Sequence, residues 1–497
     1  MRTKLGIVSM AVIISSATVA SAENWSQFRG AGASGLTGEA RLPTTWGPEQ
    51  NVAWKVKLPG MAWSQPVVWG ERIFVTTAVT ENQSKPSVGQ GGGRGGFGGP
   101  RPGGSRPPQG DEPRRQRGEA DRPDAPRAAS DGPAREDGNR PGREGGGRGG
   151  IGRAAGPPDQ TYRWLVLCLD GKTGQVLWEQ LAHEGKPTIA THRSNTYASE
   201  TPVVDGERVY AYFGMIGLFA YDLAGKLLWH KDVGHYDMSN GWGTGSSPVI
   251  DGDRLFLQCD NEVQSFLLAL DKRTGDELWR VTRAEQSNWS TPYVWRNGKR
   301  TELVTAGGGK MRSYDPATGK VLWELAGVTG RCSATPVGTA DLLYLGVGGG
   351  RRGAGPLVAI RAGAEGELSS EGDKPSEGIA WVAPRGGPPL ASPLVYQGNV
   401  YVLEQRGGIV GCYDAATGQE HYRKRIEGAK GFTSSPWASD GKIYCLDEDG
   451  QTFVLEAGPE LKVVGTNKLN DQFWSSVAVA KDHLLLRGVE YLYSIGP

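Results

Sequence analysis

The sequence predicts an all-β protein, an eight-bladed β-propeller built from four-stranded antiparallel blades. A short strand pattern that begins with a small polar residue and usually Pro occurs eight times, and after residue 200 it returns every 41 to 57 residues. That interval is the length of one four-stranded propeller blade. A second phrase, of the type YDPATGKVLW at 314–323, occurs in most repeats. The eight marker positions are Pro66, Pro202, Pro248, Pro292, Pro336, Pro393, Pro436 and Val477.

Each repeat contains the elements of one blade in order. The first strand starts at the marker and ends in a tight turn such as Asp205-Gly206 or Asp251-Gly252, which is typical of hairpins. A second strand, a variable loop and a third strand that ends in Tyr-Asp or Leu-Asp follow. A Thr-Gly turn then leads into the fourth strand. We expect the fourth strands to end at Trp178, Trp229, Trp279 and Trp323.

The two ends of the chain predict that the ring closes on itself. The last repeat has three strands and then the chain ends, while NVAWKVKL at 51–58 offers a fourth strand with Trp54 in the expected place. Pairing the first strand with the last blade removes an open sheet edge. We therefore predict a propeller over residues 51–497, preceded by an N-terminal lead segment at 23–50.

The repeated phrase has a structural explanation at each position. Its Asp can accept hydrogen bonds from the N–H groups of the turn, and its Gly can adopt the left-handed conformation that a side chain resists. The Trp ring can fill the wedge between blades. The residues concerned are Asp170, Gly174, Trp178, Asp271, Gly275, Trp279, Asp315, Gly319, Trp323, Asp414 and Gly418.

This phrase resembles the tryptophan-docking repeat of propellers of the pyrroloquinoline quinone (PQQ) type. The repeat occurs in quinoprotein alcohol dehydrogenases and in BamB, the propeller lipoprotein of the bacterial outer-membrane β-barrel assembly machine. The resemblance covers the chain from about residue 50 to 497. The dehydrogenases and BamB share this fold, so the resemblance implies the fold but leaves both a catalytic and a non-catalytic function open.

Residues 1–22 have the pattern of a signal peptide. Arg2 and Lys4 precede the apolar run LGIVSMAVII, and Ala20-Ser21-Ala22 resembles a cleavage site. We expect an exported, soluble protein in the periplasm or outside the cell, with no transmembrane span after cleavage. No Cys stands near the cleavage site, so a lipid anchor is not expected.

Residues 81–160 form a Gly/Pro/Arg-rich insertion in the first blade, and this composition predicts disorder. Its RGG-like pieces resemble RNA-binding tails, but export and a chain net charge of +1 argue against nucleic acid as a partner. The insertion could instead cover a binding site or recruit a partner, or it could be a neutral surface loop.

Metal and thiol chemistry find little support in the sequence. The five cysteines are scattered and the six histidines lack zinc-ligand spacing, so we expect buried free thiols and no metal site. The resemblance to quinoprotein dehydrogenases would imply a vicinal Cys-Cys disulfide over the quinone and a Ca²⁺ ion bound by Glu, Asn and Asp. No two cysteines are adjacent here. We therefore expect no catalytic residue and no cofactor. The alternative hypothesis is a PQQ-dependent dehydrogenase, which would bind PQQ and Ca²⁺.

A binding site is expected at the mouth of the central channel, on the face that carries the variable loops. The candidate residues are Trp63, His192, Glu200, Trp289, Arg331 and Trp474. They could bind a protein, a peptide or a small ligand. The competing interpretation is that the polar groups satisfy strand ends while the tryptophans pack between blades. The sequence thus predicts an exported binding or assembly scaffold.

Overall fold

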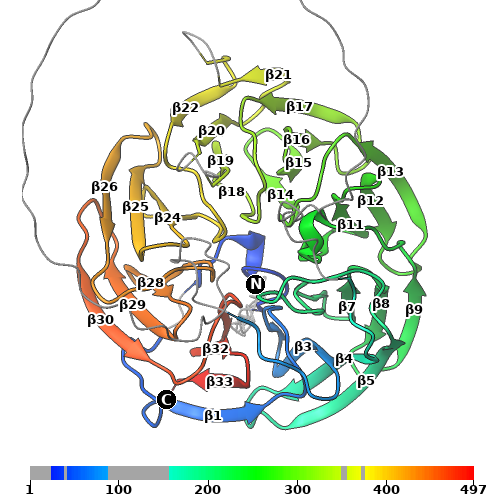
Figure 1. The fold of residues 1–497 in the computed structure, drawn as a ribbon. Helices are drawn as coiled ribbons and strands as arrows, with labels where there is room; N and C mark the ends of the chain where they lie inside the picture. Colours follow the sequence, from blue (N-terminus) through cyan, green and yellow to red (C-terminus); the bar gives the residue numbers. More distant parts are fainter. Residues whose placement is uncertain (1–23, 39–41, 88–155, 349–354, 371–374, 497) are drawn as a thin grey trace, which may run out of the picture. The chain divides into compact units, whose positions relative to one another are not determined.

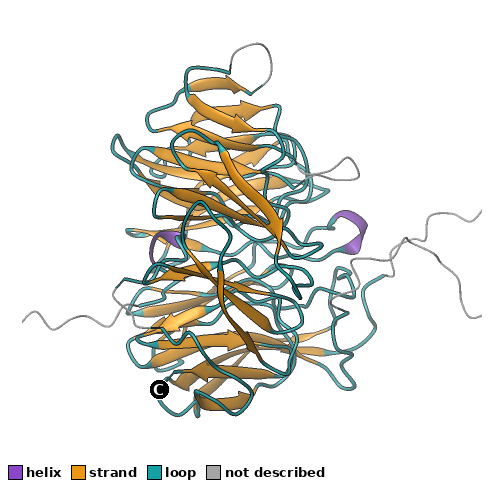
Figure 2. Cartoon of the chain, turned by 90° about the vertical axis from the view of Figure 1, so that its left-hand side faces the viewer, coloured by secondary structure: helices purple, strands orange, loops and turns teal. Residues whose placement is uncertain are grey.

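The computed structural model describes residues 24–38, 42–87, 156–348, 355–370 and 375–496. The chain divides into two compact units, residues 1–92 with 154–497 and residues 93–153, and the second lies outside the described residues. In the first unit eight sheets form a closed ring (Figure 1). Its described helical elements are two 3-10 turns, η1 (Ala31–Ala33) and η2 (Ser239–Gly241), which lie on opposite sides of the ring in Figure 2. The predicted eight-bladed all-β propeller is confirmed.

The blades follow one another along the chain and are numbered here from 1 to 8. Blades 1 to 3 consist of β2 (Val67–Trp69), β3 (Arg72–Val79), β4 (Tyr162–Asp170) and β5 (Val176–Gly185); β6 (Val203–Val204), β7 (Arg208–Phe213), β8 (Gly217–Asp222) and β9 (Leu227–Lys231); and β10 (Val249–Asp251), β11 (Arg254–Cys259), β12 (Ser265–Asp271) and β13 (Glu277–Arg283). Blades 4 and 5 consist of β14 (Tyr293–Arg296), β15 (Thr301–Thr305), β16 (Met311–Tyr314) and β17 (Val321–Ala326); and β18 (Val337–Gly338), β19 (Leu342–Gly346), β20 (Leu357–Arg361) and β22 (Ile379–Ala383). Blades 6 to 8 consist of β23 (Leu394–Tyr396), β24 (Asn399–Leu403), β25 (Ile409–Asp414) and β26 (Glu420–Arg425); β27 (Trp437–Ser439), β28 (Lys442–Leu446), β29 (Gln451–Glu456) and β30 (Val463–Lys468); and β31 (Ala478–Ala480), β32 (His483–Arg487), β33 (Tyr491–Ile495) and β1 (Val52–Lys57).

The core lies between neighbouring blades. The middle strands β7 and β12 are buried along almost their whole length, whereas the outer strand β13 alternates between half-buried and exposed positions. One core cluster joins Tyr210 of β7 to Leu255 and Leu257 of β11. Sheets that are covered on both faces need continuous apolar strands, which explains the runs of Val, Leu and Tyr in the sequence.

A series of hydroxyl groups connects the inner strands around the ring. The N–H of Thr201, which precedes the marker Pro202, donates to Ser247 Oγ of the next blade at 2.9 Å, and the N–H of Ser247 donates to Thr291 Oγ1 at 3.0 Å. The other hydrogen bonds of this kind join Gln65 to Thr201, Thr335 to Ser392, Ser392 to Ser435 and Ser435 to Ser476. At six of the eight markers the preceding Ser or Thr hydroxyl thus satisfies a buried backbone N–H of the neighbouring blade. Gln65 and Thr335, which precede the other two markers, do not accept in this way.

The ring closes through the N-terminal strand, as predicted. β1 pairs antiparallel with β33, with Trp54 opposite Ser494 and Val56 opposite Leu492. At the inner strands Gln65 completes the junction, since its Nε2 donates to the carbonyl oxygen of Val477. The first and last strands of the chain therefore pair within blade 8 and close the ring.

The tryptophans of the outer strands dock on the turn of the following blade. Trp229 Nε1 donates to the carbonyl oxygen of Lys272 at 3.2 Å, and a Cβ on Gly275, whose φ is 78°, would lie 2.8 Å from the Trp229 ring. Equivalent hydrogen bonds join Trp54 to Gly171, Trp178 to Leu223, Trp279 to Pro316 and Trp381 to Ala415. The sequence analysis did not identify Trp381 as a member of this set.

The turns that receive these rings have the expected geometry. Asp271 Oδ1 accepts hydrogen bonds from the N–H groups of Arg273 and Thr274, and the first of these is the main cause that lowers the pKa of Asp271. Asp170, Asp315 and Asp414 accept the same pair of hydrogen bonds. Gly174, Gly319 and Gly418 have φ values of 72°, 72° and 75°.

The expectation that the outer strands end at Trp was wrong. Trp178 and Trp229 are the third residues of β5 and β9, which continue to Gly185 and Lys231. The ladder to the third strand shifts register just before the tryptophan, between Cys168 and Leu169 in blade 1 and between Ala220 and Tyr221 in blade 2. Such a bulge redirects a side chain, and here it lets the ring reach the next blade while the strand goes on.

Trp323 departs from this pattern at the junction of blades 4 and 5. Its ring is fully buried and its Nε1 donates to Glu302 Oε2 of its own blade at 2.8 Å. The connection that follows β20 lacks the Asp-x-x-Thr-Gly phrase and instead contains β21 (Gly366–Ser369), which pairs in parallel with β17 as a fifth strand. Trp323 still packs with Leu345 and Ile360 of blade 5. Trp323 therefore fills the space between blades 4 and 5, as predicted, but it does not dock on a turn of blade 5.

Residues 24–38 of the lead segment contact the inner strands and lie at the centre of the ring, where Figure 1 shows blue ribbon. The carbonyl oxygens of Trp25 and Ser26 accept hydrogen bonds of 2.8 Å from the N–H groups of Val68 and Val204. Leu36 forms a parallel bridge with Ala438 of blade 7. The predicted channel is thus partly filled by the chain itself.

Two sequence predictions concern residues outside the described part. The signal peptide at 1–22 is one, and residues 88–155 of the insertion at 81–160 are the other. Among the described residues there is no helix with the length and apolar character needed to cross a membrane.

We predict that Gly275→Ala is more destabilising than Gly252→Ala. Both glycines have positive φ, so each substitution costs about 1 to 2 kcal/mol of backbone strain. A Cβ at Gly252 meets nothing within 4 Å, whereas at Gly275 it overlaps the Trp229 ring, which adds about 1 to 3 kcal/mol. Urea unfolding measures both changes. Equal losses of stability would show that the Trp–Gly contact contributes nothing.

Candidate functional site

One face of the ring carries the long connections between blades. The strands of a blade alternate in direction, so the loops after the second and fourth strands share one face, called here the loop face. The connection from β9 to β10 contains η2 and lies on this face. All six candidate residues belong to loops of the loop face or to the residues that lead into the inner strands.

Trp63 and Trp474 lie together, where blade 8 meets blade 1. Their ring centroids are 5.7 Å apart with an interplanar angle of 28°. Trp63 is 7% exposed, its Nε1 donates to the carbonyl oxygen of Ser194 at 2.8 Å, and it packs with Val489. For these two residues the geometry matches the competing interpretation, in which tryptophans pack between blades.

His192, Trp289 and Arg331 gather around a fourth residue, Trp242, which the sequence analysis missed. The Trp242 and Trp289 ring centroids are 5.5 Å apart, and Arg331 Cζ lies 4.8 Å from the Trp242 ring centroid. The His192 ring meets Trp242 edge-on at 6.4 Å. Trp242 is 37% exposed. We call these four residues the Trp242 patch.

Hydrogen bonds between loops of successive blades hold the Trp242 patch in place. Trp289 Nε1 donates to the carbonyl oxygen of Gly243 at 2.7 Å, and Arg331 Nη2 donates to Ser239 Oγ. Asn195 Nδ2 donates to the carbonyl oxygen of Trp242 at 2.9 Å. A guanidinium stacked on an exposed indole leaves cationic and aromatic surface available to a partner. The GWGTG stretch at 241–245, just before a marker, was the available signal for Trp242.

Glu200 lies away from solvent, with 2% exposure. Its Oε1 accepts from the N–H of Gly214 at 3.3 Å and its Oε2 from the N–H of Ser199 at 3.2 Å. Burial raises the pKa of Glu200, and hydrogen bonds from neutral groups, with Thr244 the largest contributor, oppose this only in part. The carboxyl group therefore serves the loop structure and does not reach the surface.

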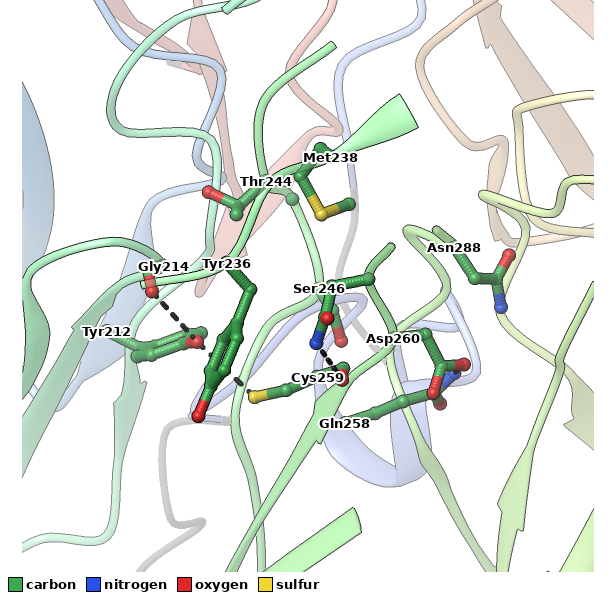
Figure 3. Close-up of a pocket in the computed structure, with 12 residues that line it drawn as sticks. Tyr212, Gly214, Tyr236, Met238, Thr244, Ser246, Gln258, Cys259, Asp260 and Asn288 are labelled. Carbon is green, nitrogen blue, oxygen red and sulfur yellow. Dashed lines mark hydrogen bonds between the residues drawn. The ribbon is translucent and has the colours of Figure 1, made fainter. Parts of the chain in front are cut away.

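A small cavity lies between blades 2 and 3 (Figure 3), and Gly214 in its lining donates its N–H to Glu200. Its volume is about 30 Å³, enough for one or two water molecules. Asp260 is the carboxylate in its lining and is bound by Arg283 through hydrogen bonds of 2.7 and 3.0 Å. The lining residues are Tyr212, Gly214, Tyr236, Met238, Thr244, Gly245, Ser246, Gln258, Cys259, Asp260, Asn261 and Asn288. Cofactor sites measure about 300 to 1,000 Å³, so this cavity suits solvent.

Two arginines are buried near the centre of the ring without a carboxylate partner among the described residues. Arg487 Nη1 donates to Ser64 Oγ at 2.8 Å, and burial lowers the pKa of Arg487 to about 9. Arg29 Nη2 donates to the carbonyl oxygen of Pro393 at 2.7 Å, and burial lowers the pKa of Arg29 to about 10. Both cations are held by neutral acceptors, which is an unusual use of arginine.

The fold and its repeat define a class of protein, the propellers with PQQ-type tryptophan-docking repeats. A family model described as outer membrane protein assembly factor BamB matches residues 163–335 and 364–458, more than half of the chain. The chain belongs to this family. A search of curated proteins finds no match.

Solved structures with the same fold include two dehydrogenases. A europium-containing methanol dehydrogenase is 10% identical, with 94% of this chain and 90% of that chain covered and a TM-score of 0.53. The quinohemoprotein alcohol dehydrogenase from Comamonas testosteroni is 10% identical, with 97% and 82% covered and a TM-score of 0.56. BamB from Moraxella catarrhalis is 14% identical, with 66% and 88% covered and a TM-score of 0.48. At these identities the likeness to the dehydrogenases shows the fold alone.

Three features of the described residues differ from what the resemblance implies for PQQ held with Ca²⁺. All five cysteines are free thiols, so no disulfide stands over a quinone site. Within the described ranges no group of three or more His, Cys, Asp and Glu side chains could hold a metal ion. The lead segment contacts the inner strands at the centre of the ring, and the cavity beside Glu200 is too small for the quinone.

We predict that Glu200→Gln stabilises the protein at neutral pH. The folded-state pKa of Glu200 lies above its ordinary value of 4.5, so wild-type stability falls as pH rises through the folded pKa, and the variant escapes this loss. Urea unfolding should give the same free energy of unfolding for the wild type and the variant at about pH 4. At about pH 8 the variant should have the larger free energy of unfolding. The exposed Glu427→Gln is the control. A difference that does not change with pH would contradict the prediction.

Arg487→Met should raise the free energy of unfolding by about 1 to 3 kcal/mol, because it removes a buried cation that lacks a counter-ion. Ser64 Oγ keeps its hydrogen bonds with Thr76 in the variant. Thermal and urea unfolding at neutral pH measure the change. A clear loss of stability would mean that the guanidinium has a partner that the described residues do not supply.

Proposed function

We propose that this chain is an exported, non-catalytic binding scaffold that recognises an acidic segment of a protein or peptide at the Trp242 patch. The observation that carries the proposal is the exposed Trp242 ring beneath the Arg331 guanidinium, beside His192 and Trp289. Aromatic and arginine side chains dominate the energy of protein interfaces. Export rests on the signal-peptide pattern of residues 1–22.

Charge and position favour an acidic partner. Arg331 and Arg193 are exposed on the loop face, and Arg331 uses Nη2 for Ser239 while the rest of its guanidinium stacks on Trp242. A carboxylate could bind the free guanidinium N–H groups, while an apolar side chain could pack on the indole. The family description, an assembly factor, agrees with a protein partner.

The test uses a fluorescein-labelled acidic peptide, acetyl-Glu-Tyr-Glu-Trp-Glu-amide, and measures fluorescence anisotropy. Arg331→Ala and Trp242→Ala should each weaken binding by about tenfold, since each removes a contact of about 1.4 kcal/mol. Arg280→Ala is the matched control, because Arg280 also stacks on an aromatic ring, 4.2 Å from the Phe266 centroid, but lies on β13.

Two results would overturn the proposal. One is that the peptide does not bind, or that Arg331→Ala and Arg280→Ala weaken its binding equally. The other comes from incubating the full chain with PQQ and Ca²⁺ and passing it over a desalting column. A retained quinone absorbance together with reduction of an electron-acceptor dye would establish the dehydrogenase alternative.

A further inference from the structure

The outer strand of every blade has one edge that its own sheet leaves unpaired. In Figure 1 these strands form the circumference of the ring. An unpaired edge presents backbone N–H and C=O groups that can pair with another chain, and proteins protect such edges with charges, especially lysine, or by covering them. The eight outer edges of this propeller differ in how they are protected.

Two outer edges have other parts of the chain beside them. β17 pairs in parallel with β21, from Trp323 opposite Gly366 to Ala326 opposite Ser369. β30 is flanked by the lead segment, because Asn467 Oδ1 accepts from the N–H of Trp46 at 2.8 Å and Asn467 Nδ2 donates to the carbonyl oxygen of Thr44.

Most other outer strands carry basic residues after the bulge at the tryptophan position. β26 reads EHYRKR and β1 reads VAWKVK. β9 ends in His230-Lys231, and Arg280 follows Trp279 in β13. β22 is short, and its residues are buried or half-buried. These features are the usual means of preventing edge pairing.

β5 lacks lysine and arginine, although it carries Glu179 and Glu184 and a second register shift after Leu181. It is the longest outer strand, with ten residues. Leu177 is 51% exposed and Leu181 is 47% exposed, and the exposed Glu179 lies between them while Trp178 and Gln180 are half-buried. Within the described residues β5 pairs only with β4. Its solvent side thus presents two leucines separated by a carboxylate.

We propose that the edge of β5 binds an extended segment of a partner protein as a fifth strand, and that the segment has the pattern apolar-x-basic-x-apolar. β21 on β17 is the example within the same molecule, since it begins to pair at the tryptophan directly after the bulge. The corresponding stretch of β5 is Trp178–Leu181, where the ladder to β4 is regular.

The side chains of β5 determine what the added strand should contain. Strand addition derives its affinity from main-chain hydrogen bonds and its specificity from alternate side chains. A basic residue beside Glu179 and an apolar residue beside Leu181 would make favourable cross-strand pairs, and a second apolar residue could contact Leu177 in the bulge. β21 shows that an added strand also contributes side-chain contacts, since Leu368 lies beside Leu325 on the strand face that carries Trp323. This surface lies on the outer strand of blade 1 and does not depend on the Trp242 patch.

The experiment titrates the full chain with the peptide acetyl-Thr-Val-Thr-Lys-Thr-Val-Thr-amide and measures binding by isothermal titration calorimetry. Leu181→Lys gives β5 the basic residue that the other edges carry, and it should weaken binding by about tenfold or more. Leu228→Lys on β9 is the matched control, because Leu228 is also exposed, at 41%, and should leave binding unchanged. Arg331→Ala should likewise leave it unchanged, which separates this surface from the proposed acidic-peptide site.

Two further measurements test the backbone and the charge. A peptide with N-methylated alternate residues keeps its side chains but loses main-chain donors, and it should not bind. Glu179→Lys should prefer a peptide in which Glu replaces the central Lys. The proposal is overturned if the parent peptide does not bind, if Leu181→Lys and Leu228→Lys bind it equally, or if the N-methylated peptide binds as well as the parent.

Discussion

The contact between a tryptophan ring and the glycine of the next blade's turn is the constraint on which this propeller depends. Eight twisted sheets diverge toward the circumference, and at five of the eight junctions a tryptophan fills the outer side and docks on the turn of the next blade. Trp229 over Gly275 shows the arrangement, with an indole hydrogen bond to Lys272 and no space for a Cβ. At the inner side of the ring the gap is narrow, and a single hydroxyl such as that of Ser247 is enough.

The junctions also decide where a partner can bind. With the lead segment hydrogen-bonded to the inner strands, the centre of the ring is no longer an empty channel. The loops that leave the junctions carry the remaining aromatic surface. Trp242, Trp289 and Arg331 come from connections between three successive pairs of blades, so the patch they form exists only when those blades are correctly packed. This arrangement is the structural basis of the proposal that a partner binds at the loop surface.

The bulge that directs each tryptophan has a second consequence at the circumference. It leaves a short regular stretch of outer strand with an unpaired edge, and the chain treats these stretches differently from blade to blade. Lys55 and Lys57 protect β1, β21 covers β17, and β5 has Leu181 and Glu179 in the equivalent place. Each repeat therefore contributes a blade to the ring and also an outer strand edge. The side chains after the bulge determine whether that edge is protected or can pair with another strand.

The sequence by itself determined the number of blades, the closure by the strand around Trp54 and the turn geometry of Asp271 and Gly275, because each depends on residues close together in the chain or on a repeated period. Only the tertiary structure decided how the exceptions behave. Trp323 binds Glu302 because the next blade lacks a docking turn, and Trp242 meets Arg331 across loops 89 residues apart in sequence. Such contacts depend on which elements become neighbours after folding, and no local pattern of residues contains that information.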